Sequence, residues 1–438
     1  MPLNLPWLEV TSRTFDDTQY DFVVKVAPGK PPTCCPGSEM VRNGTKRVLF
    51  RDLPMHGKHV GIQVDRQRFK CKACGKSQYQ SVPNMSIRHE MTERLVSYIE
   101  QKSMERTFRA LSFEVGLSEG VIRNIFRRYA KARLDKLQPV TPVWMGLDEL
   151  YIMSKFRGVV TNVKDRTLVE FLPNRNKPTI IRYLAAISDP ETVKIVTIDM
   201  WQPYRDAVGL VLPHARVVVD KFHVVRMANE ALERVRKEFR LTLPTRSRLQ
   251  LKDDRWMLLT NPEKLDAGRH LLLQEMMERF PVLKQAWQAR EGFRAVWAAP
   301  TVPEAKAAYA AWVSSIHPDV EPAFCDLIRA MTNWETEIFA YFDTRATNAY
   351  TESFNAVAKM TNRLGRGYSF EVLRARLLLM HSCHKTEPVP YRRPAVPMYG
   401  LSMARTASFM CQEPPEERYL GLDLSTLATE LEKLPQNG

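Results

Sequence analysis

The sequence lacks an apolar run long enough to cross a membrane. A membrane-spanning helix needs about 20 consecutive apolar residues, and no such run occurs among the 438 residues. The first ten residues, MPLNLPWLEV, also lack the basic region and apolar core of a secretory signal. We therefore expect a cytoplasmic protein with no membrane partner.

Cysteine is too scarce and too unevenly placed for a disulfide framework. The chain has seven cysteines, an odd number. Four of them cluster in the N-terminal region: Cys34, Cys35, Cys71 and Cys74. The other three are scattered: Cys325, Cys383 and Cys411. This distribution is typical of a metal site in a reducing compartment.

Acidic residues are outnumbered by basic ones. Lys and Arg number 64 against 49 Asp and Glu, which gives a net charge of +15. An apolar content of 44% excludes a largely disordered chain, and the length favours about two to four domains. The charge favours a polyanionic partner, DNA or RNA, although many basic proteins bind nothing acidic.

The cysteine cluster has one regular and one irregular half. In CKACG at 71–75, two residues separate the thiols and a glycine follows, as in a zinc knuckle. Cys34 and Cys35 are adjacent, and neighbouring side chains of an extended segment point to opposite sides. We expect a structural zinc ion with four ligands: Cys34, Cys35, Cys71 and Cys74. Alternatively, His56 or His59 replaces one of the adjacent pair, or the pair are simple buried thiols.

Residues 86–138 have the pattern of three short helices. TERLVSYIEQKSM, RTFRALSFEVG and SEGVIRNIFRRYAKARL carry apolar residues at helical spacing, and Ser118 suits the N-cap of the third. The third segment carries polar and basic residues suited to a major groove: Arg123, Asn124, Arg127, Arg128 and Lys131. We predict a DNA-binding helix-turn-helix, with an ordinary helical connector bearing a solvated basic face as the alternative.

Apolar strands and helices alternate after the linker QPVTP. The predicted elements are strands at 144–152, 157–163 and 166–172, a helix at 178–187, a strand at 193–198, another helix, and a strand at 216–219. This is the element order of a ribonuclease H-like core. In that fold, carboxylates that bind divalent metal cations lie at set positions. The first lies on the first strand and the second follows the fourth strand, which gives Asp148 and Asp199. Asp220 ends the fifth strand and competes with Asp199, so we keep it with His223 as a candidate beside the metals.

The segment TNAYTESFNAVAKMTNR carries the third acid on a helix predicted over 348–364. Polar residues recur every three or four positions on one face: Asn348, Glu352, Asn355, Lys359 and Arg363. Apolar residues lie opposite: Phe354, Val357, Ala358 and Leu364. We expect the apolar face to pack. Glu352 then lies near the helix N-terminus, where the dipole favours a carboxylate, and Lys359 and Arg363 face phosphates. Taken alone, each acid has the alternative of local hydrogen bonding.

Four blocks of sequence together resemble a known family. They are RDLPMHGKHVGIQVDRQRFKCKACGKS, GLDELYI, TIDMWQPYRDAVGLVLPHARVVVDKFHVVRMANEALERVRK and TNAYTESFNAVAKMTNRLGRGYSFEVLRARLLL. Over most of residues 30–385 the chain resembles bacterial insertion-sequence transposases of the ISL3 family. That family has a zinc-ribbon head, a helix-turn-helix and a DDE catalytic core with an α-helical insertion. The family usually opens its zinc ribbon with CPxCG, whereas this chain has TCCPGS.

The resemblance implies a multidomain α/β protein. The implied parts are a zinc-ribbon-like domain at 1–85, a helix-turn-helix at 86–138, a ribonuclease H-like core at 139–225 and 341–384, an all-α insertion at 226–340, and a C-terminal tail at 385–438. The DDE triad then falls on Asp148, Asp199 and Glu352.

We therefore expect a DNA transposase. It would bind double-stranded DNA, both the terminal inverted repeats of its element and the target, in the bacterial cytoplasm at the nucleoid. Two Mg²⁺ ions at the three acids would activate water or a 3′-hydroxyl and stabilise the leaving oxygen. Cutting two ends in concert requires a homodimer or a larger assembly. The alternatives are a transposase-derived DNA-binding regulator with an inactive core, and a metal-dependent nuclease for structured DNA.

Three further features have both a functional and a structural interpretation. Trp201 and Tyr204 either stack on an unpaired base or pack in the core. His223 orients Asp220, contacts DNA or plays a structural part. Basic residues of the insertion either clamp DNA phosphates or solvate helices: Arg234, Arg236, Lys237, Arg240, Arg246 and Arg248.

Overall fold

The computed structural model describes residues 3–5, 7–26, 31–248 and 255–382. All of them belong to one unit of the chain, Met1–Lys385. The tail predicted at 385–438, and with it Cys411, lies outside the described residues, as does Cys383. Among the described helices, none combines the length and the apolar character that a membrane span requires.

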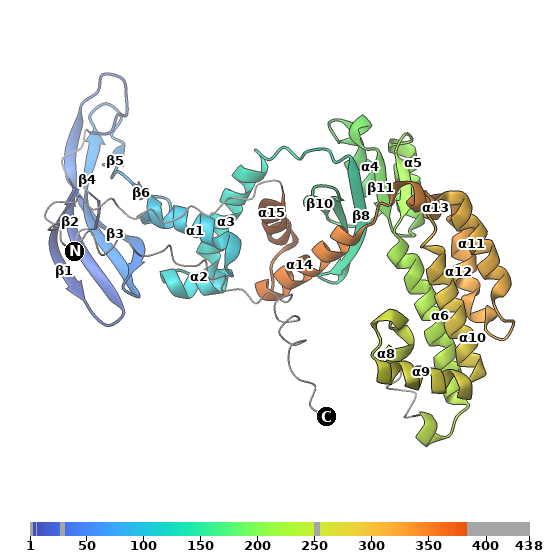
Figure 1. Ribbon diagram of the computed structural model, residues 1–438. Coiled ribbons are helices and arrows are strands. Elements are labelled where there is room, and N and C mark those ends of the chain that lie inside the picture. The colour runs from blue at the N-terminus through green and yellow to red at the C-terminus, as the bar shows by residue number, and fades with distance from the viewer. Residues whose placement is uncertain (1–2, 6, 27–30, 249–254, 383–438) are drawn as a thin grey trace, which may run out of the picture. The chain divides into compact units, whose positions relative to one another are not determined.

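A seven-stranded sheet forms the N-terminal part (Figure 1). Its strands are β1 (Leu8–Phe15), β2 (Gln19–Val26), β3 (Met40–Met55), β4 (Lys58–Cys71), β5 (Ser77–Tyr79), β6 (Met85–Ser86) and β7 (Met91–Thr92). Their order is β1-β2-β4-β3-β7-β6, with β5 paired to β4. Phe50 of β3 and Ile62 of β4 are fully buried in its core. Because Met91 pairs with Arg51 of β3, the sheet continues past the domain boundary predicted at residue 85.

Three helices follow directly, as the sequence predicts. They are α1 (Glu93–Glu105), α2 (Phe108–Val115) and α3 (Glu119–Leu134). Each begins at a hydroxyl side chain that accepts a backbone N–H: Thr92, Thr107 and Ser118. Gly116 ends α2 in the left-handed region, at φ 67°, where glycine is free of strain. A turn of only three residues therefore separates α2 from α3.

A second, five-stranded sheet lies in the middle of the chain. Its strands are β8 (Trp144–Ile152), β9 (Lys155–Asn162), β10 (Thr167–Leu172), β11 (Ile195–Ile198) and β12 (Arg216–Val219). The order is β10-β9-β8-β11-β12. The pairs among β8, β9 and β10 are antiparallel, whereas β11 pairs in parallel with both β8 and β12. The strands predicted from apolar runs are thus confirmed to within three residues at each end.

The two faces of this sheet pack against different helices, since neighbouring strand residues point to opposite sides. Val160 belongs to the core that includes α4 (Lys177–Ala185) and α5 (Gln202–Val211). Val159 belongs to a second core, shared with α14 (Ala349–Gly365), α15 (Phe370–His381) and the three N-terminal helices. A 3₁₀ turn (Pro190–Thr192) precedes β11. The acidic helix α14 therefore covers one face of the sheet.

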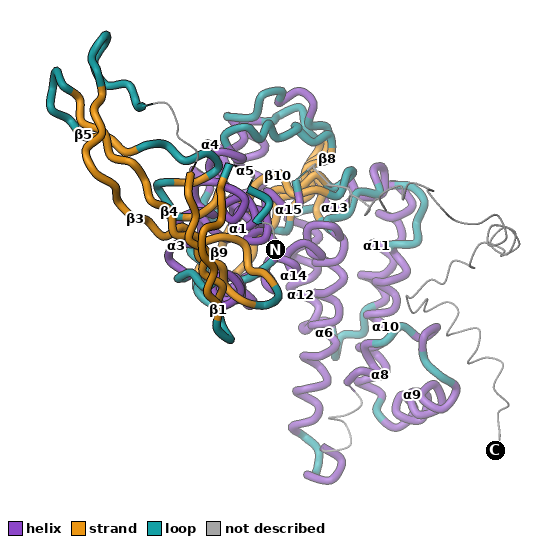
Figure 2. The backbone as a smooth tube through the Cα atoms, turned by 90° about the vertical axis from the view of Figure 1, so that its left-hand side faces the viewer, coloured by secondary structure: helices purple, strands orange, loops and turns teal. Residues whose placement is uncertain are grey.

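The segment between β12 and α14 is helical throughout its described part (Figure 2). Its helices are α6 (Lys221–Leu241), α8 (Arg255–Leu259), α9 (Ala267–Arg279), α10 (Pro281–Val296), α11 (Val302–Ser315), α12 (Glu321–Asn333) and α13 (Glu335–Thr344), with a 3₁₀ turn at Pro262–Lys264. The helix α6 packs along α10 and α12, and α13 packs on β12. The segment 226–340, predicted as an insertion, lies within this helical stretch from Lys221 to Thr344.

Candidate active site

Three aspartates follow one another across the carboxyl ends of the parallel strands. Leu147 of β8 pairs with Ile198 of β11, and Ile198 pairs with Val219 of β12. The next residue on each strand path is an acid: Asp148, Asp199 and Asp220. In open α/β sheets this edge is where ligands bind. The fold therefore concentrates negative charge at a position suited to cations.

Asp148 is held by hydrogen bonds in a buried setting. Its side chain is only 4% exposed. The amide of Asn355 on α14 donates to Oδ2 at 2.7 Å, and the backbone N–H of Glu149 donates to Oδ1 at 2.6 Å. Burial, and then the charge of Asp199, raise the pKa of Asp148 to about 8. Two carboxylates this close need a nearby positive charge to stay ionised at neutral pH.

Four buried polar residues fix the start of α14, and with it Glu352. This lock consists of Thr161, Thr197, Asn348 and Thr351. Gly146 of β8 lies between Thr161 of β9 and Thr197 of β11 in one row of the sheet. The Thr161 hydroxyl is 2.6 Å from that of Thr351, and the Thr197 hydroxyl donates to Asn348 Oδ1 at 3.2 Å. Because Gly146 has no side chain, α14 can approach the sheet here. Glu352 follows Thr351 directly and is thereby positioned over the edge of the sheet.

Asn348 does not share the exposed face of Glu352, contrary to the prediction from helical spacing. It is fully buried at the N-terminus of α14. Its amide oxygen accepts from the hydroxyls of Thr197 and Thr351, and this pairing draws it into the sheet. Leu364, predicted to pack, is instead 63% exposed. Its position beside the helix C-terminus, beyond the buried Ala358, takes it past the core.

His223 connects two of the acids. It lies in the first turn of α6 and is buried. Its Nδ1 is 2.9 Å from Asp199 Oδ1, and its Nε2 is 3.7 Å from Glu352 Oε1. Burial alone would lower the pKa of His223, but the adjoining Asp199 outweighs it and the pKa is raised. The imidazole therefore orients Asp199 and Glu352. The sequence alone suggests only Asp220 as the residue that His223 orients.

Asp220 lies close to both His223 and Glu352. Asp220, His223 and Glu352 each offer a donor atom within 4.8 Å of the others. Among the described residues, Asp148, Asp199 and Glu352 do not form a group this tight. The register of β12 places Asp220 in the same row as the other two aspartates. In the described part of the chain, Asp220 Oδ2 is buried and has no hydrogen-bond partner.

The two basic residues on the predicted polar face of α14 are exposed to solvent. Lys359 and Arg363 are exposed on α14, and among the described residues neither side chain has a hydrogen bond or ion pair. They remain accessible to a ligand that approaches Glu352 along the helix.

Tyr204 and Trp201 have different environments. Tyr204 is fully buried and its hydroxyl donates to the Asp148 carbonyl at 3.2 Å, so its role is core packing. Trp201 is 36% exposed, and its ring lies 4.2 Å from the guanidinium of Arg175. Arg175 in turn forms an ion pair with Glu149. The sequence contains no spacing signal that singles out Arg175.

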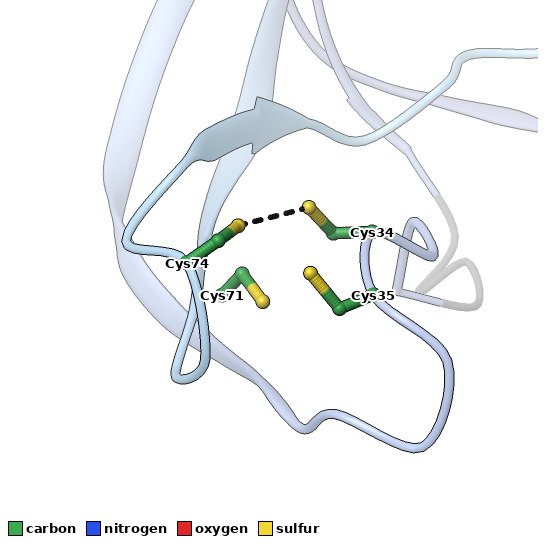
Figure 3. A group of neighbouring side chains, drawn as sticks. All are labelled: Cys34, Cys35, Cys71 and Cys74. Carbon is green, nitrogen blue, oxygen red and sulfur yellow. Dashed lines mark hydrogen bonds between the residues drawn. The ribbon is translucent and has the colours of Figure 1, made fainter.

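The four N-terminal cysteines converge (Figure 3). All four sulfur atoms lie within 4.8 Å of one another, and those of Cys34 and Cys74 are 3.3 Å apart. The adjacent pair can face the same way because the chain turns at once: Ser38 N–H donates to the Cys35 carbonyl. The Ser38 hydroxyl, followed by the Cys74 backbone N–H, lowers the pKa of the Cys71 thiol to about 6. The donor set suits a tetrahedral zinc ion.

The two histidines considered as alternative zinc ligands lie elsewhere. The ring of His56 packs edge-on against Tyr20, at 6.2 Å between centroids. His59 lies against Gly116, where a built Cβ would come within 2.9 Å of its ring. Neither belongs to the cysteine group.

The basic residues of α3 are mostly presented to solvent. Asn124, Arg127, Arg128 and Lys131 are exposed, and Arg128 also contacts His89. Arg123 is half-buried, with its guanidinium 6.0 Å from the Phe108 ring. One face of α3 thus presents several basic and polar groups to solvent.

Part of the basic set in the insertion has a structural role. Arg236 is buried and forms an ion pair with Glu233 at 2.7 Å. Arg240 donates to the Arg248 carbonyl at 2.7 Å, and Arg248 donates to that of Leu243. Arg234 forms an ion pair with Asp326 of α12. Lys237 Nζ lies 3.9 Å from Glu233, the carboxylate that Arg236 also contacts, and Arg246 is exposed. Most of these charges therefore have partners within the protein.

Comparison with known protein families decides the identity of the chain. A family model for transposases of the ISL3 DDE type matches residues 145–377, more than half of the chain. A second model, the zinc finger of transposases IS204/IS1001/IS1096/IS1165, matches residues 31–74. The chain belongs to the ISL3 transposase family. The match of the second model includes all four clustered cysteines, so this ISL3 transposase has a zinc-ribbon region despite its irregular first cysteine pair.

Two curated relatives of this transposase are distant in sequence. The transposase for insertion sequence element IS1001 of Bordetella parapertussis is 22% identical over 327 residues, which cover 73% of this chain and 80% of that protein. The transposase for insertion sequence element IS1557 of Mycobacterium tuberculosis is 25% identical over 281 residues, 58% of this chain and 63% of that protein.

Proposed function

We propose that this ISL3-family transposase cleaves DNA at the ends of its insertion sequence and joins the freed ends to target DNA. The observation that carries the proposal is the row of aspartates at one edge of the sheet, met by Glu352 from α14. The strand order β10-β9-β8-β11-β12, with three antiparallel strands and two parallel ones, supports a ribonuclease H-like core.

The residues at this edge fit divalent cations. Carboxylate oxygens are the ligands that Mg²⁺ prefers, and the buried Oδ2 of Asp220 has no hydrogen-bond partner within the described residues. Asp148, Asp199 and Glu352 would hold two such ions, with Asp220 close enough to share one. When bound, the cations supply activation of the attacking oxygen and stabilisation of the leaving one.

The protein's own groups keep the carboxylates in place. Asn355 donates to Asp148 and leaves Oδ1 of that acid to the backbone N–H of Glu149. His223 touches both Asp199 and Glu352. The hydrogen bonds of the lock hold the start of α14 against the sheet, where Gly146 leaves room for the helix. Lys359 and Arg363 extend the helix face with charges that suit DNA phosphates.

DNA recognition belongs to the N-terminal half in this proposal. The zinc-ribbon region and a helix-turn-helix formed by α2 and α3 would bind the terminal inverted repeats as double-stranded DNA. The helical segment from α6 to α13 would be the insertion that interrupts the ribonuclease H-like core. Concerted cutting of two ends requires two active sites, so we propose a homodimer or larger assembly on DNA.

A cleavage assay on the element's own ends tests the proposal. Wild-type protein with Mg²⁺ or Mn²⁺ should nick labelled ends, and Asp199→Ala should bind them equally well without nicking. Asp220→Asn, compared side by side, shows whether Asp220 ligates or only supports. Joining of pre-cut ends to a plasmid distinguishes a transposase from a nuclease, whereas binding without cleavage by the wild type would favour a regulator.

A further inference from the structure

A cavity of about 540 Å³ opens next to the aspartate row. It is formed by the start of β9, the loop before α4 and the start of α5. Trp201, on its wall, follows Asp199 by two residues, and Arg175, also on its wall, pairs with Glu149. Its volume falls in the range of small-molecule sites, about 300–1,000 Å³.

The wall of the cavity holds two aromatic rings in a fixed arrangement. The Arg175 guanidinium lies 3.8 Å from the Phe156 ring centroid and 4.2 Å from that of Trp201. Its ion pair with Glu149 keeps the guanidinium in place. Even so, the residues Phe156 and Trp201 remain 42% and 36% exposed. Large aromatic surface held rigidly in a concave site is suited to stacking a planar ligand.

The polar groups of the cavity select an anionic ligand with hydrogen-bonding edges. Lys155 is exposed, and no hydrogen bond or ion pair of the described residues uses its ammonium group. Lys177 is kept near the wall by Asp206, at 2.9 Å. The amides of Asn174 and Asn176 add donors and acceptors, and no acid is among the described residues that line the cavity. Free cation, amides and aromatic rings together match a nucleotide.

We propose that this cavity binds one unpaired deoxynucleotide next to the scissile phosphate. Its base would stack on Trp201 and its phosphate would contact Lys155. A base inside a duplex has both faces covered by its neighbours, so only an extruded or single-stranded base offers a face to the indole. The inference rests on the proposed strand cleavage, because that reaction brings DNA to the adjoining carboxylates.

The test measures the gain in affinity from an overhang. The probe is a fluorescein-labelled duplex ending in a short oligothymidylate overhang, compared by anisotropy with the same duplex blunt, without added divalent cation. Full-length wild type should bind the overhang probe more tightly. Trp201→Ala should weaken overhang binding about tenfold, within the usual range for loss of one base stack, and leave the blunt duplex unchanged.

Further variants separate the roles of base and phosphate. Trp201→Phe should restore most of the loss, since a benzene ring still stacks. Lys155→Ala should also weaken binding of the overhang probe, because it removes the phosphate contact. With abasic sugar-phosphate in place of the overhang bases, the effect of Trp201→Ala should disappear and that of Lys155→Ala should remain. Trp256→Ala, which removes another exposed indole on α8, serves as the matched control and should bind both probes like wild type.

Several results would overturn the proposal. These are equal wild-type affinity for both probes, an unaltered overhang preference in Trp201→Ala, or equal losses on the two probes. The readout is binding alone, so it is distinct from failure of the proposed function. Protein that prefers the overhang but never cuts DNA would retain the nucleotide site and refute the cleavage reaction.

Discussion

Replacing Gly146 with alanine should displace α14 from the sheet and inactivate the transposase. A Cβ at this position would lie 2.5 Å from the hydroxyl oxygens of Thr161 and Thr351 and 2.6 Å from Asn348 Oδ1. None of these atoms is the free end of a flexible chain, because all three belong to the buried hydrogen-bonded lock. The strand cannot yield either, since β8 is paired on both sides at this row.

The size of the effect follows from overpacking and lost hydrogen bonds. Extra methyl volume in a tight core costs about 1–3 kcal/mol. Forcing one pair of the lock apart leaves a buried polar group unpaired, at about 1–3 kcal/mol for each group. The free energy of unfolding should therefore fall by about 2–6 kcal/mol. A shift of about 1 Å in Glu352 is enough to reduce cleavage about 100-fold.

Thermal unfolding and strand cleavage would be measured on the same preparations, with Gly209→Ala as the matched control. Gly209 lies on the exposed side of α5, and no atom of the described residues comes within 4 Å of a built Cβ there. Its replacement should stabilise the helix by about 0.5–1 kcal/mol and keep cleavage intact. Duplex binding should survive in both variants. If Gly146→Ala melts and cuts like Gly209→Ala, the account of how Glu352 is positioned is wrong.

Two other predictions follow from the contacts of single residues. Asn355→Leu removes the hydrogen bond to Asp148, worth about 1.5–3 kcal/mol for a charged acceptor, and should slow cleavage about 10- to 100-fold with duplex affinity unchanged; an unchanged rate would contradict it. Cys71→Ser should abolish bound zinc in elemental analysis and lower the unfolding temperature, whereas Cys325→Ser, an exposed cysteine outside the cluster, should retain the metal.

Local patterns in the sequence were enough to predict the core elements. The runs around VWMGLDELYI and VKIVTI are apolar because β8 and β11 are buried on both faces, which makes such strands visible without a structure. The three N-terminal helices and α14 were equally visible from their spacing. The convergence of Asp148 and Asn355 follows from these elements, because the helix covers the strand that carries the acid.

Contacts between distant residues were not predictable in the same way. The lock joins Thr161, Thr197, Asn348 and Thr351 across nearly 200 positions of sequence, and none of these residues has a local signal. Asn348 therefore looked like part of the exposed face. The proximity of Asp220 to Glu352 depends on the register of β12 against β11, which apolar runs alone do not determine. Cys34 and Cys35 both reach the other two cysteines because the chain makes one tight turn after them.

The most direct test of the central claim is strand cleavage by Glu352→Gln. Glutamine keeps the size of the side chain and removes its charge, so the helix and the lock should remain intact. We predict that the variant folds, binds duplex ends with wild-type affinity and produces no nicked strand with Mg²⁺ or Mn²⁺. Cleavage at the wild-type rate by this variant would contradict the assignment of Glu352, and with it the proposed cation site.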